Sequence, residues 1–164
     1  MSISFNAEEV FQLAEQIERN GAKFYRRASK SFSEPAIQKV LLDLASMELD
    51  HERVFAEMKA DFVRAKGKTM VVDPYDEGVL YLRAIADGHV FDVKVDPSER
   101  LRGREKGSDI LRMAIGLEKD SVVFYQGIRE IVPEELGKDR VEAVIKEEMK
   151  HITQLSRQLA SLVE

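Results

Sequence analysis

The chain has 164 residues, which is enough for one domain with a single core. Hydrophobic residues make up 44% and charged residues 34% of it, with only nine Gly and four Pro, so we expect a folded, helix-rich protein rather than a disordered one. The net charge is −5 without a basic run and there is no cysteine, which argues against nucleic-acid binding and excludes disulfides, thiolate metal sites and cysteine nucleophiles.

Two segments before residue 66 carry the periodicity of amphipathic helices. The first runs from about 6 to 31 and opens with Asn6 and Glu9, which can form a capping box. The second begins after Ser33-Glu34-Pro35, where a capping residue is followed by an early proline, and runs to about 65. At a rise of 1.5 Å per residue the longest helix would reach about 45 Å, a length that suits a helical bundle.

The segment from about 66 to 107 differs in composition, because residues that favour turns and break helices recur along it. One short helix is expected at about 77–86, and the alternating pattern of 89–95 allows an extended strand. His89 stands alone there and is expected to be a solvated turn residue. About 40 residues are too many for a simple turn but enough to travel the length of a bundle and return.

Two more helical segments follow the crossover, from about 108 to just before Pro133 and from 134 or 138 to about 162. We therefore predict an all-α fold with a single domain over residues 1–164. The expected architecture is a four-helix bundle made of two helical hairpins joined by one long crossover at about 66–107.

The two halves of the chain resemble copies of one another with an offset of 100 residues. The residues Ala14, Glu18, Phe24, Tyr25, Glu48 and His51 recur as Ala114, Glu118, Phe124, Tyr125, Glu148 and His151. An internal repeat of this kind implies a two-fold arrangement in which both copies contribute to one shared feature.

That shared feature is a set of four glutamates and two histidines that lie at mid-helix, on helix faces that are otherwise largely apolar or small. They are Glu18, Glu48, His51, Glu118, Glu148 and His151. Burying an unpaired carboxylate costs several kcal/mol and four together repel one another, yet the same faces carry no Lys or Arg. Two divalent cations would cancel four negative charges, and two imidazole nitrogens would help to fill their coordination shells.

This pattern is typical of dinuclear carboxylate bundles, in which two helices contribute one glutamate each and the other two contribute one Glu-x-x-His motif each. In this scheme Glu48 and Glu148 bridge the two metals, while Glu18 and Glu118 each cap one metal. The alternative is a polar layer that only fixes the register of the helices.

Five other polar residues near the set allow two interpretations each. In the first interpretation Tyr25 and Tyr125 are core tyrosines whose hydroxyls hydrogen-bond to some partner. In the second they either donate a hydrogen bond to a ligand carboxylate or act as electron sources beside the metals. Asp50, Glu147 and Lys150 either lie at the surface, which we expect, or orient an imidazole from a neighbouring helix.

Four motifs carry a resemblance to a known family. They are Ile17-Glu18-x-x-Gly-x-x-Phe24-Tyr25, Glu48-Leu-Asp-His51, Leu117-Glu118-Lys-Asp-x-x-x-Phe124-Tyr125 and Glu148-Met-Lys-His151. With these motifs the chain resembles the rubrerythrin family within the ferritin-like superfamily over essentially its whole length. The resemblance implies a ferritin-like bundle with a carboxylate-bridged di-iron centre that reacts with peroxide or dioxygen, a role in oxidative stress, and the six residues above as ligands.

The sequence departs from that family at two points. Rubrerythrins carry a rubredoxin-like domain with a cysteine-bound iron, whereas this chain has no cysteine, so electrons are expected from an external donor such as a rubredoxin-like protein. Rubrerythrins also place an additional glutamate one turn after the ligand of the third helix, where this chain has Ser121, with Gly21 as its repeat partner. The remaining six-residue set resembles that of ferroxidase and oxidase centres.

Three hypotheses follow for the function. The leading one is a di-iron oxidoreductase that reduces hydrogen peroxide or dioxygen, and the second is an iron-binding ferroxidase of the ferritin type. The third is a scaffold that keeps the residues for stability and holds zinc or no metal. Oxygen and nitrogen ligands without sulfur suit two iron ions, with manganese or zinc as possible occupants.

The remaining expectations concern surroundings and assembly. The N-terminus has neither the basic nor the apolar segment of a signal peptide, and no apolar run approaches the roughly 20 residues that span a bilayer. We therefore expect a cytoplasmic protein that binds neither membrane nor nucleic acid, and the resemblance favours a homodimer.

Overall fold

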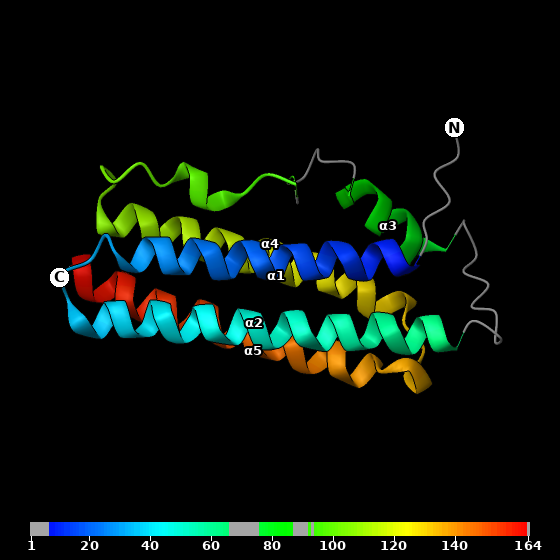
Figure 1. Ribbon diagram of the computed structural model, residues 1–164. Helices are drawn as coiled ribbons and strands as arrows, with labels where there is room; N and C mark the ends of the chain where they lie inside the picture. The colour runs from blue at the N-terminus through cyan, green and yellow to red at the C-terminus, as the bar shows by residue number, and fades with distance from the viewer. Residues whose placement is uncertain (1–6, 66–75, 87–91, 93, 164) are drawn as a thin grey trace.

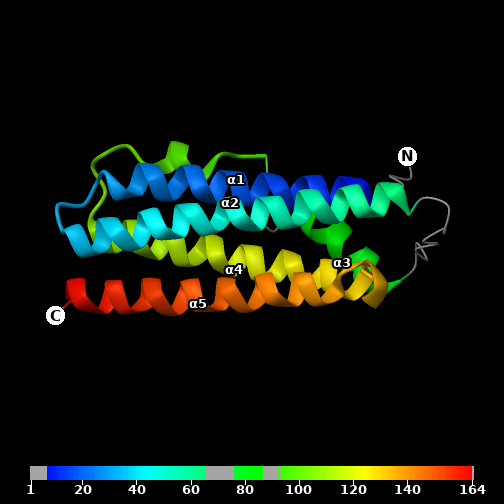
Figure 2. The same ribbon diagram turned by 60° about the horizontal axis from the view of Figure 1, so that its bottom comes forward.

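Long helices form in the segments whose apolar residues repeat with the helical period (Figure 1). The computed structural model describes residues 7–65, 76–86, 92 and 94–163. The four long helices in this part of the chain are α1 (Ala7–Ser29), α2 (Pro35–Arg64), α4 (Gly107–Ile131) and α5 (Lys138–Val163). Figure 2 shows them along one bundle, with α1 and α2 forming one hairpin and α4 and α5 the other, which confirms the predicted all-α architecture.

Proline and glycine mark the boundaries of these helices. Pro35 starts α2, where its fixed φ suits the helix and its missing N–H would have had no intrahelical partner. Pro133 follows α4, and a 3-10 turn, η2 (Glu134–Leu136), leads to Gly137, whose φ of 97° favours glycine. For this reason α5 begins at Lys138, the later of the two starts that the sequence allows.

The start of α1 is only partly described. Glu9 lies in its first turn, but Asn6 is outside the described residues, so the capping box remains a prediction.

The connection between the hairpins lies against α1 and α4 (Figure 1). It contains α3 (Glu77–Ala86), which matches the predicted short helix and packs on α4. It also contains a 3-10 turn that the sequence analysis did not predict, η1 (Pro97–Arg100), which packs on α1. This turn is capped by Asp96, whose Oδ1 accepts a hydrogen bond from the backbone N–H of Ser98 at 2.9 Å.

The strand allowed at 89–95 is wrong for the part of that segment that the structure describes, namely 92, 94 and 95. The backbone N–H of Val95 donates to the carbonyl of Asp92 at 3.2 Å, and the N–H of Lys94 donates to Asp92 Oδ1 at 2.9 Å. A short acidic side chain that accepts bonds from the following backbone favours a turn over a strand. His89 lies outside the described residues.

Apolar side chains form two clusters, one on each side of the mid-bundle polar layer. The first cluster includes Phe11, Phe55, Phe124 and Ile128, and α3 adds Leu82 and Ile85 to it. The second cluster includes Phe24, Leu41, Leu44 and Ile110, and Leu101 from the crossover joins it. The polar layer between them is therefore closed off from water along the bundle axis.

Candidate metal centre

The six residues singled out by spacing meet in one buried layer, and all four long helices contribute to it. Glu18 lies on α1 and Glu118 on α4, while α2 and α5 each carry a glutamate and a histidine three positions apart and hence on one face. None of the six is more than 3% exposed. The repeat of 100 residues thus becomes a repeat in space across the bundle.

The ligand atoms form two overlapping groups, each within 4.8 Å from atom to atom. The first metal position, as we call it, is the group Glu18, Glu48, His51 and Glu148. The second metal position is the group Glu48, Glu118, Glu148 and His151. Glu48 and Glu148 belong to both, which is the arrangement that the sequence predicts for bridging carboxylates.

The inner atoms of the layer, namely the two Nδ1 atoms and the carboxylate oxygens that face them, approach to ion-pair distances without hydrogen-bond geometry. Nδ1 of His51 lies 3.0 Å from Glu148 Oε1, and Nδ1 of His151 lies 2.9 Å from Glu148 Oε2. Both Nδ1 atoms and at least one carboxylate oxygen of each of the four glutamates are buried with no hydrogen-bond partner in the described part of the chain. Buried polar atoms without partners are rare, and a convergent set of them fits cations that coordinate all of them at once.

Crowding of charge shifts the pKa values of these groups in the metal-free protein. Burial, together with the charge of Glu148, raises the pKa of Glu18 to about 7, and burial also raises the pKa of Glu48 and of Glu118 well above the usual range. Burial opposes charging of the two histidines, but the adjacent carboxylates outweigh it and raise the pKa of each to about 12. Glu148 is the exception, because both imidazoles approach it and lower its pKa despite its burial. Protons therefore offset much of the negative charge when no metal does.

Two buried tyrosines connect opposite hairpins to the layer. The hydroxyl of Tyr25 on α1 donates to Glu118 Oε1 on α4, and the hydroxyl of Tyr125 on α4 donates to Glu18 Oε1 on α1. Burial and the nearby glutamates raise the pKa of both tyrosines, so the hydroxyls keep their protons. Of the interpretations that the sequence allows, the structure supports hydrogen bonds to the proposed ligands.

Beyond the layer, Glu147 contacts His51 across the α2–α5 interface. Its Oε2 lies 2.7 Å from Nε2 of the imidazole, although the Glu147 side chain is 43% exposed. Glu147 thus lies near the surface and also orients an imidazole from a neighbouring helix. Asp50 and Lys150 are exposed, as expected.

Gly21 provides the space that the carboxylate of Glu48 occupies. A Cβ atom at this position would lie 2.6 Å from Glu48 Oε2. In the other half of the repeat Ser121 fits, with its hydroxyl donating to the carbonyl of Leu117 at 3.1 Å. In the sequence Gly21 stands out only as the repeat partner of Ser121, and spacing along the chain does not reveal this close approach.

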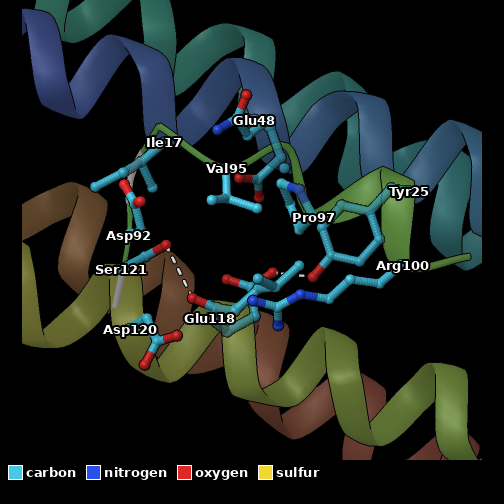
Figure 3. A pocket seen from close by; sticks show the side chains of 13 residues that line it. Ile17, Tyr25, Glu48, Asp92, Val95, Pro97, Arg100, Glu118, Asp120 and Ser121 are labelled. Atoms are coloured by element: carbon cyan, nitrogen blue, oxygen red, sulfur yellow. Dashed lines mark hydrogen bonds between the residues drawn. The ribbon is translucent and has the colours of Figure 1, made fainter. Parts of the chain in front are cut away.

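A pocket of about 60 Å³ lies between α1, α4 and the crossover and reaches the side chains of Glu48 and Glu118 (Figure 3). Gly21 and Ser121 both line it, and the crossover supplies part of its wall, with Val95, Pro97 and Arg100. Tyr25 stands beside Glu118 in the same wall (Figure 3). The centre is thus closed along the bundle axis and approached by this pocket from the side of the crossover. A second pocket, of about 340 Å³, is lined by residues of α2 and α5 that include His51 and Glu147.

Comparison with known proteins gives one family and one solved structure. A family model described as the SICA C-terminal inner membrane domain matches residues 13–137, about three quarters of the chain. The chain belongs to that family. The matched region ends directly before α5, so it includes neither Glu148 nor His151. In the part of the chain that the structure describes, no helix is both long and apolar enough to cross a membrane.

A solved structure from Thermotoga maritima, described as a ferritin-like diiron-carboxylate protein, has a TM-score of 0.70 to this chain. The sequences are 23% identical, and the similarity covers 95% of each chain. At this identity the likeness establishes the fold, and the predicted ferritin-like four-helix bundle is confirmed. The narrower rubrerythrin assignment stays a prediction. No curated protein matches the sequence.

The space at Gly21 gives a test of the layer. In Gly21→Ala the new methyl group displaces the Glu48 carboxylate, so we expect metal affinity to fall about 10- to 100-fold, the range for losing the support of a ligand. Gly116→Ala is the matched control, because its added Cβ has no atom within 4 Å beyond the neighbouring residues and backbone of its own helix, and it should stabilise α4 by about 0.5–1 kcal/mol. Calorimetric metal titration and thermal unfolding of both variants measure these effects, and equal affinities in the two variants would contradict the tight fit.

The raised pKa values predict that metal binding releases protons. Glu18, with a pKa of about 7 against 4.5 in the unfolded chain, is mostly protonated below neutral pH and must lose its proton to coordinate a cation. Each displaced proton makes the apparent affinity rise about tenfold per pH unit below the pKa, so binding should tighten from about pH 5.5 to 7. Calorimetry in two buffers of different ionisation enthalpy counts the protons, and heats that do not depend on the buffer would refute the prediction.

Proposed function

We propose that this protein is a non-haem di-iron carboxylate oxidoreductase, which reduces hydrogen peroxide or dioxygen with electrons from an external donor. The observation that carries the proposal is the buried layer of convergent ligand atoms without hydrogen-bond partners. Four carboxylates balance the charge of two divalent ions, and the oxygen and nitrogen donors suit iron, with manganese or zinc as alternatives. The solved structure with the same fold is itself described as a diiron-carboxylate protein.

In this proposal the protein holds the ligands in place and limits the access of water to the centre. Glu48 and Glu148 belong to both metal positions, whereas His51 belongs to the first position alone and His151 to the second alone. Two ferrous ions, when bound, supply two electrons, and reduction of one peroxide to two waters consumes those electrons and two protons. The tyrosine hydroxyls hold Glu118 and Glu18 in place, and the apolar clusters exclude water along the axis.

The size of the pocket supports a small oxidant. A single water needs about 10–15 Å³ in the same measure, so a pocket of about 60 Å³ admits a few molecules of that size and not an extended organic substrate. An external electron donor is part of the proposal, and a rubredoxin-like protein is the donor that we propose. A homodimer is also part of the proposal, and size-exclusion chromatography separates it from a ferritin-type cage by mass.

An anaerobic ferrous titration of the metal-free protein tests the centre. We expect saturation near two irons per chain in the wild type, and loss of this stoichiometry in Glu148→Ala, since Glu148 belongs to both positions. The loaded protein should then be oxidised by peroxide or dioxygen faster than free ferrous ion. Binding of one iron or none, unchanged by the substitution, would instead identify a structural layer. Oxidation that continues through many added irons per chain would favour the ferritin-type alternative.

Closing the pocket tests whether the oxidant approaches through it. Ser121 is 6% exposed and lines the pocket, so the larger side chain in Ser121→Leu fills that space. We expect iron stoichiometry to stay near two while the oxidation rate falls about tenfold or more, which corresponds to about 1.4 kcal/mol in the barrier. Ser121→Ala leaves the pocket open and should oxidise at the wild-type rate in stopped-flow measurements. If both variants react like the wild type, the oxidant takes another path.

A further inference from the structure

The two halves of the layer match in their ligands and tyrosines, but they differ at the outer nitrogen of each histidine. His51 and His151 lie stacked, with ring centroids 5.6 Å apart and planes inclined by 19°, and both direct Nδ1 towards the glutamates. The Nε2 atoms are therefore left for partners outside the layer. A comparison of these two atoms shows whether the repeat produces two equal metal positions.

The partners of the two Nε2 atoms are unequal. Nε2 of His51 is 2.7 Å from the carboxylate of Glu147, whereas Nε2 of His151 is buried and has no hydrogen-bond partner within the described residues. The repeat explains the difference, because the position that corresponds to Glu147 is occupied by Met47 in the first half. A thioether sulfur is only a weak acceptor and cannot replace a carboxylate.

A carboxylate at Nε2 has known consequences for a histidine that coordinates through Nδ1. It keeps the proton on Nε2, leaves the lone pair on Nδ1, fixes the orientation of the ring and raises its basicity. Loss of such a partner usually reduces metal affinity 10- to 100-fold. His51 has this support and His151 lacks it.

The two positions also differ in the pocket that their own ligands line. Glu118, which belongs to the second metal position alone, lines the pocket, and so does its hydrogen-bond partner Tyr25. Neither Glu18 nor His51, which belong to the first position alone, lines it. The pocket at the crossover therefore reaches a ligand that belongs to the second position alone (Figure 3), whereas His51 of the first position lines a separate pocket together with Glu147.

We propose that the two metal positions are unequal in affinity. The first position binds its ion more tightly because Glu147 acts as a positioning residue for His51. The second position, whose Glu118 lines the pocket at the crossover, binds its ion less tightly and exchanges it more readily. This inference rests on the proposed function only in assuming that two ions bind.

A cobalt(II) titration of the metal-free full-length chain tests the inequality without any turnover. In the wild type we expect two equivalents, with dissociation constants about 10- to 100-fold apart. Glu147→Met, which copies the first half of the repeat, should weaken the tighter step by about that factor and merge the two steps. Glu147→Gln keeps an acceptor oxygen and should lose less. Met47→Glu, which copies the second half, should tighten the weaker step.

A zinc(II) titration followed by ¹⁵N NMR of the imidazoles shows which position fills first. The chain has only three histidines, and His51→Gln and His151→Gln variants assign their signals. The first equivalent should shift the signals of His51 and the second those of His151. In Glu147→Met this order should be lost, with an unchanged thermal midpoint of the metal-free protein showing that the fold is intact.

The outcomes separate this inference from the function on which it rests. Fewer than two equivalents of metal in the wild type would refute the dinuclear centre itself. Two equivalents of equal affinity, or a tighter step that Glu147→Met leaves unchanged, would overturn the inequality while leaving the dinuclear centre in place. Filling at His151 before His51 would overturn it as well.

Discussion

Charge burial in the middle of the bundle is the constraint on which the other features depend. Four carboxylates and two imidazoles lie in one layer with almost no exposure, and their inner atoms face each other without hydrogen bonds. Such a layer needs positive charge, either from cations or from protons. The pKa of Glu18 near 7 shows the second case, in which the metal-free centre retains protons that a metal would replace. The negative charge of these residues can thus be offset either by protons or by metal ions within the same fold.

The surrounding structure isolates this layer and holds it in place. The apolar clusters on either side exclude water, which strengthens every electrostatic interaction between them. Tyr25 and Tyr125 form crossed hydrogen bonds between α1 and α4, so each hairpin supports a glutamate of the other. Gly21 brings α1 so close to Glu48 that a larger residue would displace the carboxylate. The internal repeat therefore has a structural consequence, because each half supplies residues that complete the metal centre around the ligands of the other half.

The repeat is imperfect where the chain is connected. A two-fold arrangement of hairpins has two equivalent sides, but one crossover can cover only one of them. The crossover contributes Val95, Pro97 and Arg100 to the pocket, which therefore reaches Glu118 and not its counterpart Glu18. The two halves also differ at the Nε2 atoms of the histidines. Glu147 contacts Nε2 of His51, whereas the corresponding residue in the first half of the repeat is Met47. The difference at the histidines leaves one imidazole without a carboxylate partner, which is why we infer two positions of unequal affinity from a nearly symmetric centre.

The sequence by itself determined the helices, the crossover with its short helix and the six residues of the layer. It could do so because positions three or four apart share a helix face, and because Glu18 and His51 recur 100 residues later in the same setting. Only the tertiary structure decided the start of α5 at Lys138, the turn at Asp92, the direction of the tyrosine hydroxyls, the bond between Glu147 and His51, and the pocket. These features depend on how neighbouring elements are rotated and how closely they approach. Spacing along one helix specifies which residues face inward, but it does not specify which residue of another helix they meet.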